Sequence, residues 1–206
     1  MADEAGQIVG LYERHAHEWA SDRSRPGRFM EEAWLDRFMT LIPPAGTILD
    51  IGCGFGKPVA AHLIAQGFDV CGVDSSLTMI SLCQRDFPEH EWIVGDMRML
   101  SLQHRFDGII AWDSFFHLTY DDQRRMFPVF AAHAAPGAPL MFTSGPGHGE
   151  AIGNLHGEAL YHASLDPAEY RSLLAANDFD VVDHKSNDAD CGGHTVWLAR
   201  RRTKPD

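Results

Sequence analysis

The sequence predicts an α/β fold with a seven-stranded, mostly parallel sheet and helices on both faces. Short apolar runs alternate with helical stretches between residues 47 and 144, which is the pattern of βαβ units. Two strand-like runs then close the chain with no helix between them, so an antiparallel C-terminal hairpin is expected. Two amphipathic stretches come before the first strand. The length suits one domain, 1–206.

The N-terminal part is expected to form a helical cap, residues 1–42. Apolar residues recur at helical spacing over 6–20 and over 28–42. The segment PPAG at 43–46 then interrupts the chain before the first strand.

Five central strands are expected to alternate with helices that start near Pro58, Ser76 and Asp121. Helices of this length between strands allow parallel pairing and cover both faces of the sheet. The expected strands are residues 47–51, 69–73, 91–94, 106–112 and 139–144.

The C-terminal part begins with a helix over 165–177. Asp166 suits the N-cap, with Pro167 in the first turn and Glu169 three residues after the cap. The strand-like runs 179–185 and 194–200 follow, joined by a turn-rich segment that predicts a hairpin with a long loop.

Composition restricts the class of ligand. The formal net charge is −12, which disfavours nucleic acid, because phosphate neutralisation requires a basic surface. No apolar stretch approaches the roughly 20 residues that span a bilayer, and the N-terminus has no secretion signal. Four scattered cysteines show no CxxC pair. We expect a cytoplasmic protein, monomeric or homodimeric, that binds a small and preferably cationic molecule.

Three glycines, Gly52, Gly54 and Gly56, follow directly after the first expected strand. Glycine costs backbone entropy, so such a cluster needs a positional reason. In an open α/β sheet, ligands bind beyond the carboxyl ends of the strands. The cluster therefore predicts a ligand lying against bare backbone at that edge.

The stretch from Asp50 to Gly56 reads DxGxGxG and resembles motif I of class I S-adenosylmethionine-dependent methyltransferases. Asp74 ends the second expected strand and Asp96 follows the third, as in that family. The terminal helix and antiparallel hairpin also match, so the resemblance covers roughly residues 30–200.

The resemblance implies S-adenosylmethionine as cofactor and a role for each matching residue. Asp74 and Ser75 would bind the ribose, and Asp96, with Gly95 and Met97, the adenine. Asp50 and the turn from Gly52 through Cys53 and Gly54 to Gly56 would hold the methionine end. Further cofactor contacts are expected from the end of the fourth strand and from the cap, namely Trp112, Asp113, Tyr12, Trp19 and Arg23.

Structural alternatives stand beside these roles. Asp50 could only hydrogen-bond the turn, and Asp96 could only cap the short segment after it. Trp19 also fits an apolar helical stripe, and Arg23 could be solvated.

The methyl acceptor is expected beside the end of the fourth strand, in WDSFFHL at 112–118. Ser114, Phe115 and Phe116 are candidate contacts there. His117 is the first candidate base, with a packing histidine as the alternative.

The connection 145–165 is too long for a plain link between a strand and a helix, and we expect a polar loop that walls the acceptor pocket. It supplies candidate acceptor contacts, and two of its histidines are candidate bases. A metal is not expected, because loop spacing imposes no ligand geometry. The candidate bases are His148 and His162, and the other expected contacts are Glu150, His156 and Tyr161.

We therefore expect methyl transfer from S-adenosylmethionine to an oxygen or nitrogen atom of a small metabolite. The histidines favour oxygen slightly. An NAD(P)-dependent Rossmann oxidoreductase is the first alternative. Its GxGxxG pattern would place the third glycine at position 57, which is lysine here; the third glycine of this turn comes one residue earlier. A non-catalytic regulatory module that keeps the cofactor site is the second.

Overall fold

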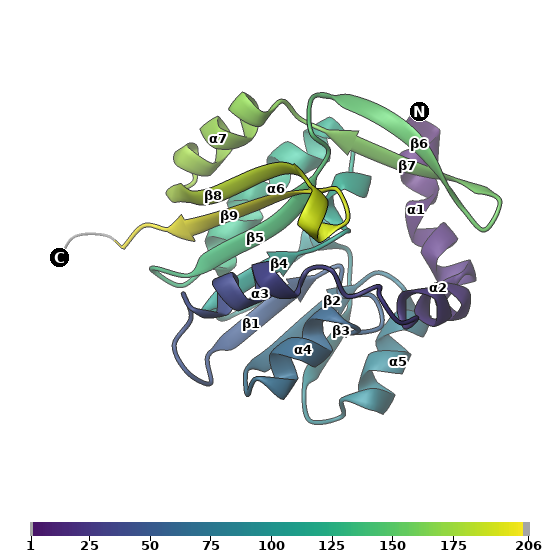
Figure 1. Cartoon of the computed structure of the whole chain (residues 1–206), viewed down its shortest axis with the longest axis horizontal. Coiled ribbons are helices and arrows are strands. Elements are labelled where there is room, and N and C mark those ends of the chain that lie inside the picture. The colour runs from purple at the N-terminus through teal and green to yellow at the C-terminus, as the bar shows by residue number, and fades with distance from the viewer. Residues whose placement is uncertain (1, 204–206) are drawn as a thin grey trace.

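A computed structural model describes residues 2–203; Met1 and residues 204–206, the ends of the expected domain 1–206, lie outside it. The core is one seven-stranded sheet in the order β3-β2-β1-β4-β5-β9-β8 (Figure 1). Its strands are β1 (Thr47–Ile51), β2 (Asp69–Asp74), β3 (Glu91–Val94), β4 (Gly108–Ala111), β5 (Pro139–Ser144), β8 (Phe179–Asp188) and β9 (His194–Arg201).

Strands β1 to β5 pair in parallel, whereas β9 runs antiparallel between β5 and β8. The predicted fold class is therefore confirmed. Because β9 is antiparallel, its first residues lie at the carboxyl edge of the parallel strands, with Thr195 paired to Ser144. The strand expected at 106–112 is shorter, since the Asp107 carboxylate accepts a hydrogen bond from the Thr47 backbone and lies at the strand end.

Helices cover both faces of the sheet. α6 (Tyr120–His133) and α7 (Pro167–Ala176) pack on one face, and α4 (Val59–Ala65) and α5 (Leu77–Asp86) on the other. The strand side chains alternate accordingly: Leu49 belongs to the first core, and Ile48 to the second.

Two of the helices begin where the sequence predicts and are capped by side chains. The Ser76 hydroxyl accepts from the Met79 backbone at α5, and the Asp166 carboxylate accepts from Ala168 at α7. Glu169 does not close a capping box; it pairs with Arg124 of α6.

The N-terminal cap is smaller than expected. α1 (Ala2–Arg14) and α2 (Ala16–Arg23) lie beside the carboxyl edge of the sheet (Figure 1). The helix expected over 6–20 is divided at His15. α3 (Glu32–Met39) belongs to the layer over the sheet, because its Trp34 and Phe38 are buried in the second core.

The segment 145–165 is a β-hairpin, not the irregular loop that we expected. β6 (Gly149–Leu155) and β7 (Glu158–Ser164) form a separate two-stranded sheet that extends beside α1 (Figure 1). The two-residue turn, His156 and Gly157, has positive φ at both positions (49° and 92°), the geometry of a type I′ turn. Histidine is not a typical first residue of that turn, so the sequence did not predict the hairpin.

No helix within residues 2–203 is both long enough and apolar enough to cross a bilayer.

Tyr170→Phe should destabilise the fold by about 2 kcal/mol, because it leaves buried partners unsatisfied. The Tyr170 hydroxyl donates to Gln123 Oε1 (2.6 Å) and accepts from the Leu165 backbone (3.0 Å), joining α6 to the end of β7. Urea denaturation measures the effect. The control is Tyr120→Phe, whose hydroxyl makes no hydrogen bond to any described residue; a change below about 0.5 kcal/mol is expected there. Equal losses in both variants would contradict this account.

Candidate active site

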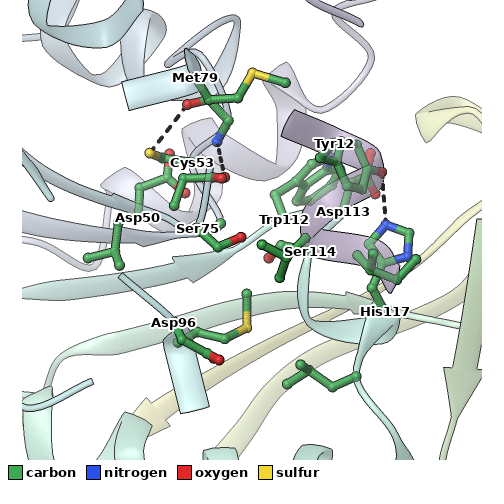
Figure 2. Close-up of a pocket in the computed structure, with 18 of the residues that line it drawn as sticks. Tyr12, Asp50, Cys53, Ser75, Met79, Asp96, Trp112, Asp113, Ser114 and His117 are labelled. Atoms are coloured by element: carbon green, nitrogen blue, oxygen red, sulfur yellow. Dashed lines mark hydrogen bonds between the residues drawn. The ribbon is translucent and has the colours of Figure 1, made fainter. Parts of the chain in front are cut away.

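A cavity of about 250 Å³ lies at the carboxyl ends of β1, β2 and β4. Residues of α1 and α2, including Tyr12 and Trp19, line it from the cap. Figure 2 shows the acids and aromatic rings that surround it. The cavity thus occupies the edge where the glycine turn predicted a ligand.

The glycine turn borders this cavity at two of its three glycines. At Gly52 (φ 77°), a Cβ would stand 2.2 Å from the Ser114 Cβ, so only glycine fits. Gly54 faces open space, and its N–H donates to Asp74 Oδ2 (2.9 Å). Gly56 does not line the cavity; it lies against Cys83 and Phe87.

Asp50 and Asp74 place buried negative charge at the inner wall. Burial, and then the charge of Asp74, raise the pKa of Asp50 to about 7. Its carboxylate accepts no hydrogen bond from any described residue. Burial also raises the pKa of Asp74. Hydrogen bonds from three backbone N–H groups lower this pKa, but the effect of burial is larger. Neither carboxylate has a cationic partner among the described residues.

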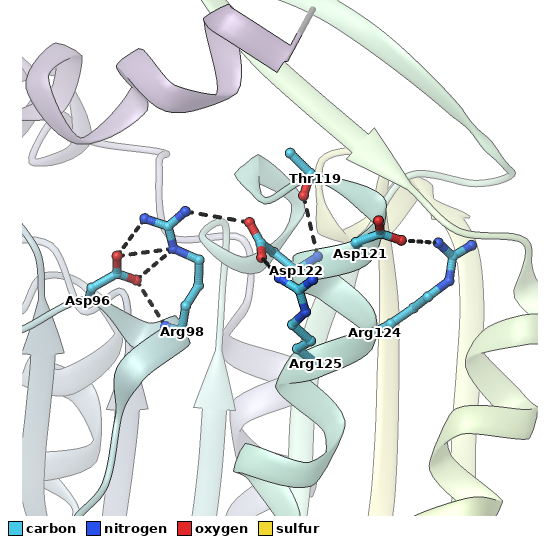
Figure 3. Close-up of polar contacts among 7 residues, drawn as sticks. All are labelled: Asp96, Arg98, Thr119, Asp121, Asp122, Arg124 and Arg125. Carbon is cyan, nitrogen blue, oxygen red and sulfur yellow. Dashed lines mark hydrogen bonds and ion pairs between the residues drawn. The ribbon is translucent and has the colours of Figure 1, made fainter.

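Asp96 is held by an arginine that the sequence had not indicated (Figure 3). Arg98 donates from Nε and Nη2 to the Asp96 carboxylate (2.9 and 2.5 Å), and from Nη1 to Asp122 of α6 (3.4 Å). Hydrogen bonds from Arg98 keep the pKa of Asp96 below its usual range. Asp96 also caps the 3₁₀ turn Met97–Met99, so the structural alternative holds as well.

Tyr12 of the cap reaches His117 across the cavity (Figure 2). His117 Nδ1 lies 2.7 Å from the Tyr161 carbonyl, which can only accept, so this nitrogen carries the proton. Burial lowers the pKa of His117 to about 4. In the neutral ring Nε2 accepts, and the Tyr12 hydroxyl donates to it (2.9 Å).

Asp113 pairs with His194 at the start of β9. Its carboxylate oxygens lie 3.0 and 3.2 Å from His194 Nε2, and His194 Nδ1 donates to the Cys191 carbonyl (2.6 Å). Both partners can only accept, which favours the doubly protonated ring. The hydrogen bond to Asp113 raises the pKa of His194 to about 9.

A second cavity, of about 440 Å³, lies between the β6–β7 hairpin and the start of β9. Most of its wall is apolar or small. Phe116 and His162 face it with their rings 5.2 Å apart, and Glu150 and His194 line it too.

Three other acceptor candidates lie elsewhere. His148 is exposed and stacks on Tyr120. His156 sits at the hairpin tip, where it stacks on His15 and pairs with Asp22 (3.4 Å). Tyr161 is buried, and its hydroxyl donates to Glu150. None of the three lines either cavity.

Phe115 is a core residue rather than an acceptor contact. It is fully buried against rings of α6, β5 and α7. No group of three or more metal-ligating side chains occurs within residues 2–203.

Comparison with known proteins fits this geometry. Residues 48–137 match a family described as a methyltransferase domain. A methyltransferase domain thus covers residues 48–137. The resemblance inferred from the sequence is thereby confirmed.

Two relatives of this chain have named activities. A dTDP-3-amino-3,6-dideoxy-alpha-D-glucopyranose N,N-dimethyltransferase from Streptomyces fradiae is 30% identical over 138 residues, covering 66% of this chain and 52% of the relative. A trans-aconitate 2-methyltransferase from Azoarcus sp. (strain BH72) is 31% identical over 99 residues, 47% and 38% of the two chains. The chain thus spans about half or less of the length of these curated relatives.

Solved structures share the fold. An amino pentose methyltransferase from Micromonospora echinaspora with bound S-adenosylmethionine aligns with TM-score 0.70 and 20% identity, over 89% of this chain and 96% of that one. Magnesium protoporphyrin IX methyltransferase from Synechocystis PCC 6803 aligns with TM-score 0.74 and 18% identity, over 96% and 99%.

The first cavity gathers nearly all the expected cofactor residues, whereas the acceptor candidates are divided. Ser114 and His117 line the first cavity, and Phe116, Glu150 and His162 line the second. The expected cofactor residues that line the first are Tyr12, Trp19, Arg23, Asp50, Gly52, Cys53, Gly54, Asp74, Ser75, Gly95, Asp96, Met97, Trp112 and Asp113.

Gly52→Ala should destabilise the protein by about 2 kcal/mol, which lowers Tm by roughly 4–8 °C, because the Cβ meets Ser114 and φ is positive. Thermal unfolding followed by circular dichroism measures the change. Gly147→Ala is the matched control, since a Cβ there meets nothing within 4 Å, and its Tm should change by less than about 2 °C. An unchanged Tm for Gly52→Ala would contradict the close approach.

Proposed function

We propose that this protein transfers a methyl group from S-adenosylmethionine to an oxygen or nitrogen atom of a small molecule. The observation that carries the proposal is the convergence of a bare glycine turn and three carboxylates, Asp50, Asp74 and Asp96, on one cavity. S-adenosylmethionine, when bound, supplies a methyl group activated by a sulfonium.

The lining residues fit the polar groups of that cofactor. Asp74 accepts backbone hydrogen bonds on both oxygens, among them those from Gly54 and Ser76, and a carboxylate has further lone pairs for ribose hydroxyls. Asp96, ionised by Arg98, can accept from the adenine amino group. The open space at Gly54 would allow a ligand to lie against the backbone.

Asp50 is suited to the cofactor's ammonium group. The residue is 2% exposed, and its carboxylate has no partner among the described residues. An ammonium there would supply both the missing hydrogen bond and the missing opposite charge. Arg23, expected to reach the cofactor carboxylate, pairs instead with Glu31 and the Arg28 carbonyl.

Similar proteins support a small acceptor. Their names specify an amino sugar nucleotide, trans-aconitate, a porphyrin and a didemethyltoxoflavin. The comparisons give no support to the NAD(P)-dependent oxidoreductase. A cytoplasmic location, and a monomer or homodimer, stay predictions.

Titration calorimetry with S-adenosylhomocysteine and NAD tests the cofactor assignment. Micromolar or tighter binding is expected for the first ligand, and none for NAD. Asp74→Ala should weaken binding at least tenfold, because ribose hydroxyls lose a charged partner. Asp180→Asn, on the far part of β8, should leave the Kd unchanged. Binding of NAD alone would overturn the assignment.

The affinity for S-adenosylhomocysteine should fall as the pH drops. Asp50, with its pKa of about 7, becomes protonated below that value and can no longer offer a charge to the ammonium. The Kd at pH 6 should therefore be about tenfold higher than at pH 8. Asp74, whose pKa is also raised, should make the dependence of the Kd on pH steeper.

Asp50→Asn should bind more weakly and show a flatter slope, measured by calorimetry at four pH values. A slope as steep as that of the unmodified protein would assign the effect to another group.

Turnover distinguishes the enzyme from a non-catalytic module. The protein should release S-adenosylhomocysteine from S-adenosylmethionine when a fractionated metabolite extract is added. Cofactor binding without any release in any fraction would favour the module.

A further inference from the structure

We propose that the methyl acceptor is an amine, received by the carboxylate of Asp113, with His194 as the residue that positions this carboxylate. The inference rests on the proposed function and specifies its substrate class. It goes against the slight preference for oxygen that the number of histidines had suggested.

The charges that line the first cavity favour a cationic acceptor. Its arginine and lysine side chains are all paired: Arg23 with Glu31, Lys57 with Asp86 (2.7 Å), and Arg98 with Asp96 and Asp122. No arginine or lysine on this wall is therefore left to bind an anionic acceptor.

Asp113 is the lining acid that the cofactor assignment does not need. Asp50, Asp74 and Asp96 match the ammonium, ribose and adenine groups. Asp122 is shared by Arg98 and Arg125. Asp113 was expected to contact the cofactor, but its place beside Tyr12 and Ser114 also suits the acceptor (Figure 2).

The polar side chains around Asp113 offer mostly lone pairs. The Tyr12 hydroxyl donates its hydrogen bond to His117, and the Ser114 hydroxyl donates to the Ile51 carbonyl (2.7 Å). The Trp112 indole N–H, on the same wall, is buried without a partner among the described residues. A group that donates hydrogen bonds, such as an amine, matches this wall better than a carboxylate.

His194 fixes Asp113 without competing for the acceptor. Both ring N–H groups are used, one on the Cys191 carbonyl and one on Asp113, so the ring presents no donor to a ligand. The Asp113 backbone has φ 47° and donates to Thr143 Oγ1 (2.9 Å). The Thr143 hydroxyl in turn lies 3.4 Å from Asp113 Oδ1, to which it donates. The carboxylate is therefore held in one orientation, with lone pairs free on each oxygen.

The histidines do not supply a free base in the first cavity. His117 has both nitrogens engaged, and His148 and His156 lie outside both cavities. His162 lines the second cavity, where burial lowers its pKa. An alcohol or phenol acceptor needs a base strong enough to take its hydroxyl proton, whereas an ammonium only has to lose its extra proton before the nitrogen lone pair can attack.

The reaction balances with Asp113 as proton acceptor. An ammonium gives one proton to the carboxylate, and the freed nitrogen lone pair forms a bond to the methyl carbon. The carbon–sulfur bond breaks, and its electron pair stays on sulfur as the thioether of S-adenosylhomocysteine. The product is a methylated ammonium, and the proton on Asp113 passes to water.

Sinefungin tests whether the Asp113 carboxylate faces the position of the transferred methyl group. In this analogue a carbon-bound ammonium replaces the methyl sulfonium. We expect the unmodified protein to bind it about tenfold more tightly than S-adenosylhomocysteine, the size of one charged hydrogen bond. Calorimetry measures both Kd values.

The variants separate the roles of the two residues. Asp113→Asn should abolish the preference for sinefungin while the Kd for S-adenosylhomocysteine changes less than threefold. His194→Gln should reduce the preference partly, and Asp180→Asn should keep it. A preference that survives Asp113→Asn overturns the assignment, and circular dichroism confirms that each variant is folded.

The class of product decides the acceptor. A metabolite extract is separated on cation and anion exchangers at pH 7, and each fraction is incubated with deuterated-methyl S-adenosylmethionine. Mass spectrometry should find the label on nitrogen, in the fraction retained by the cation exchanger. A label on oxygen, or in the anionic fraction, overturns this inference and leaves the proposed function intact. No label in any fraction overturns both.

Discussion

The structure depends on the concentration of buried negative charge at one edge of its sheet. Parallel strands bring their carboxyl ends together, so Asp50 of β1 and Asp74 of β2 share the wall of one cavity. Within the described residues neither has a cationic partner, and burial raises the pKa of both. Two desolvated acids cost stability, and a cationic ligand would offset this cost. A sulfonium compound with an ammonium group carries two positive charges and fits such a wall.

The remaining elements close this edge. Glu13 of α1 accepts from Ser76 and Thr78 at the start of α5, and Arg14 and His15 pair with Glu158 of the β6–β7 hairpin. The cap is thus tied to both sides of the cavity. Through the hydrogen bond between Tyr12 and His117 the cap also reaches the segment after β4.

Features with a local cause could be predicted from the sequence, whereas features that depend on distant register could not. The glycine turn, the acids that follow the strands and the Asp166 cap each arise from a few neighbouring residues. The pair of Asp113 and His194 joins positions 81 residues apart and follows from the pairing of Ser144 with Thr195. The expected antiparallel hairpin could have placed His194 at this edge, had the register been considered.

A crystal structure of the protein with S-adenosylhomocysteine tests the central claim most directly. The account predicts the ammonium group at Asp50, the ribose hydroxyls at Asp74 and the adenine amino group at Asp96, with the chain of the nucleoside along the glycine turn. A nucleoside bound elsewhere, or a saturated crystal with this cavity filled only by water, would contradict it.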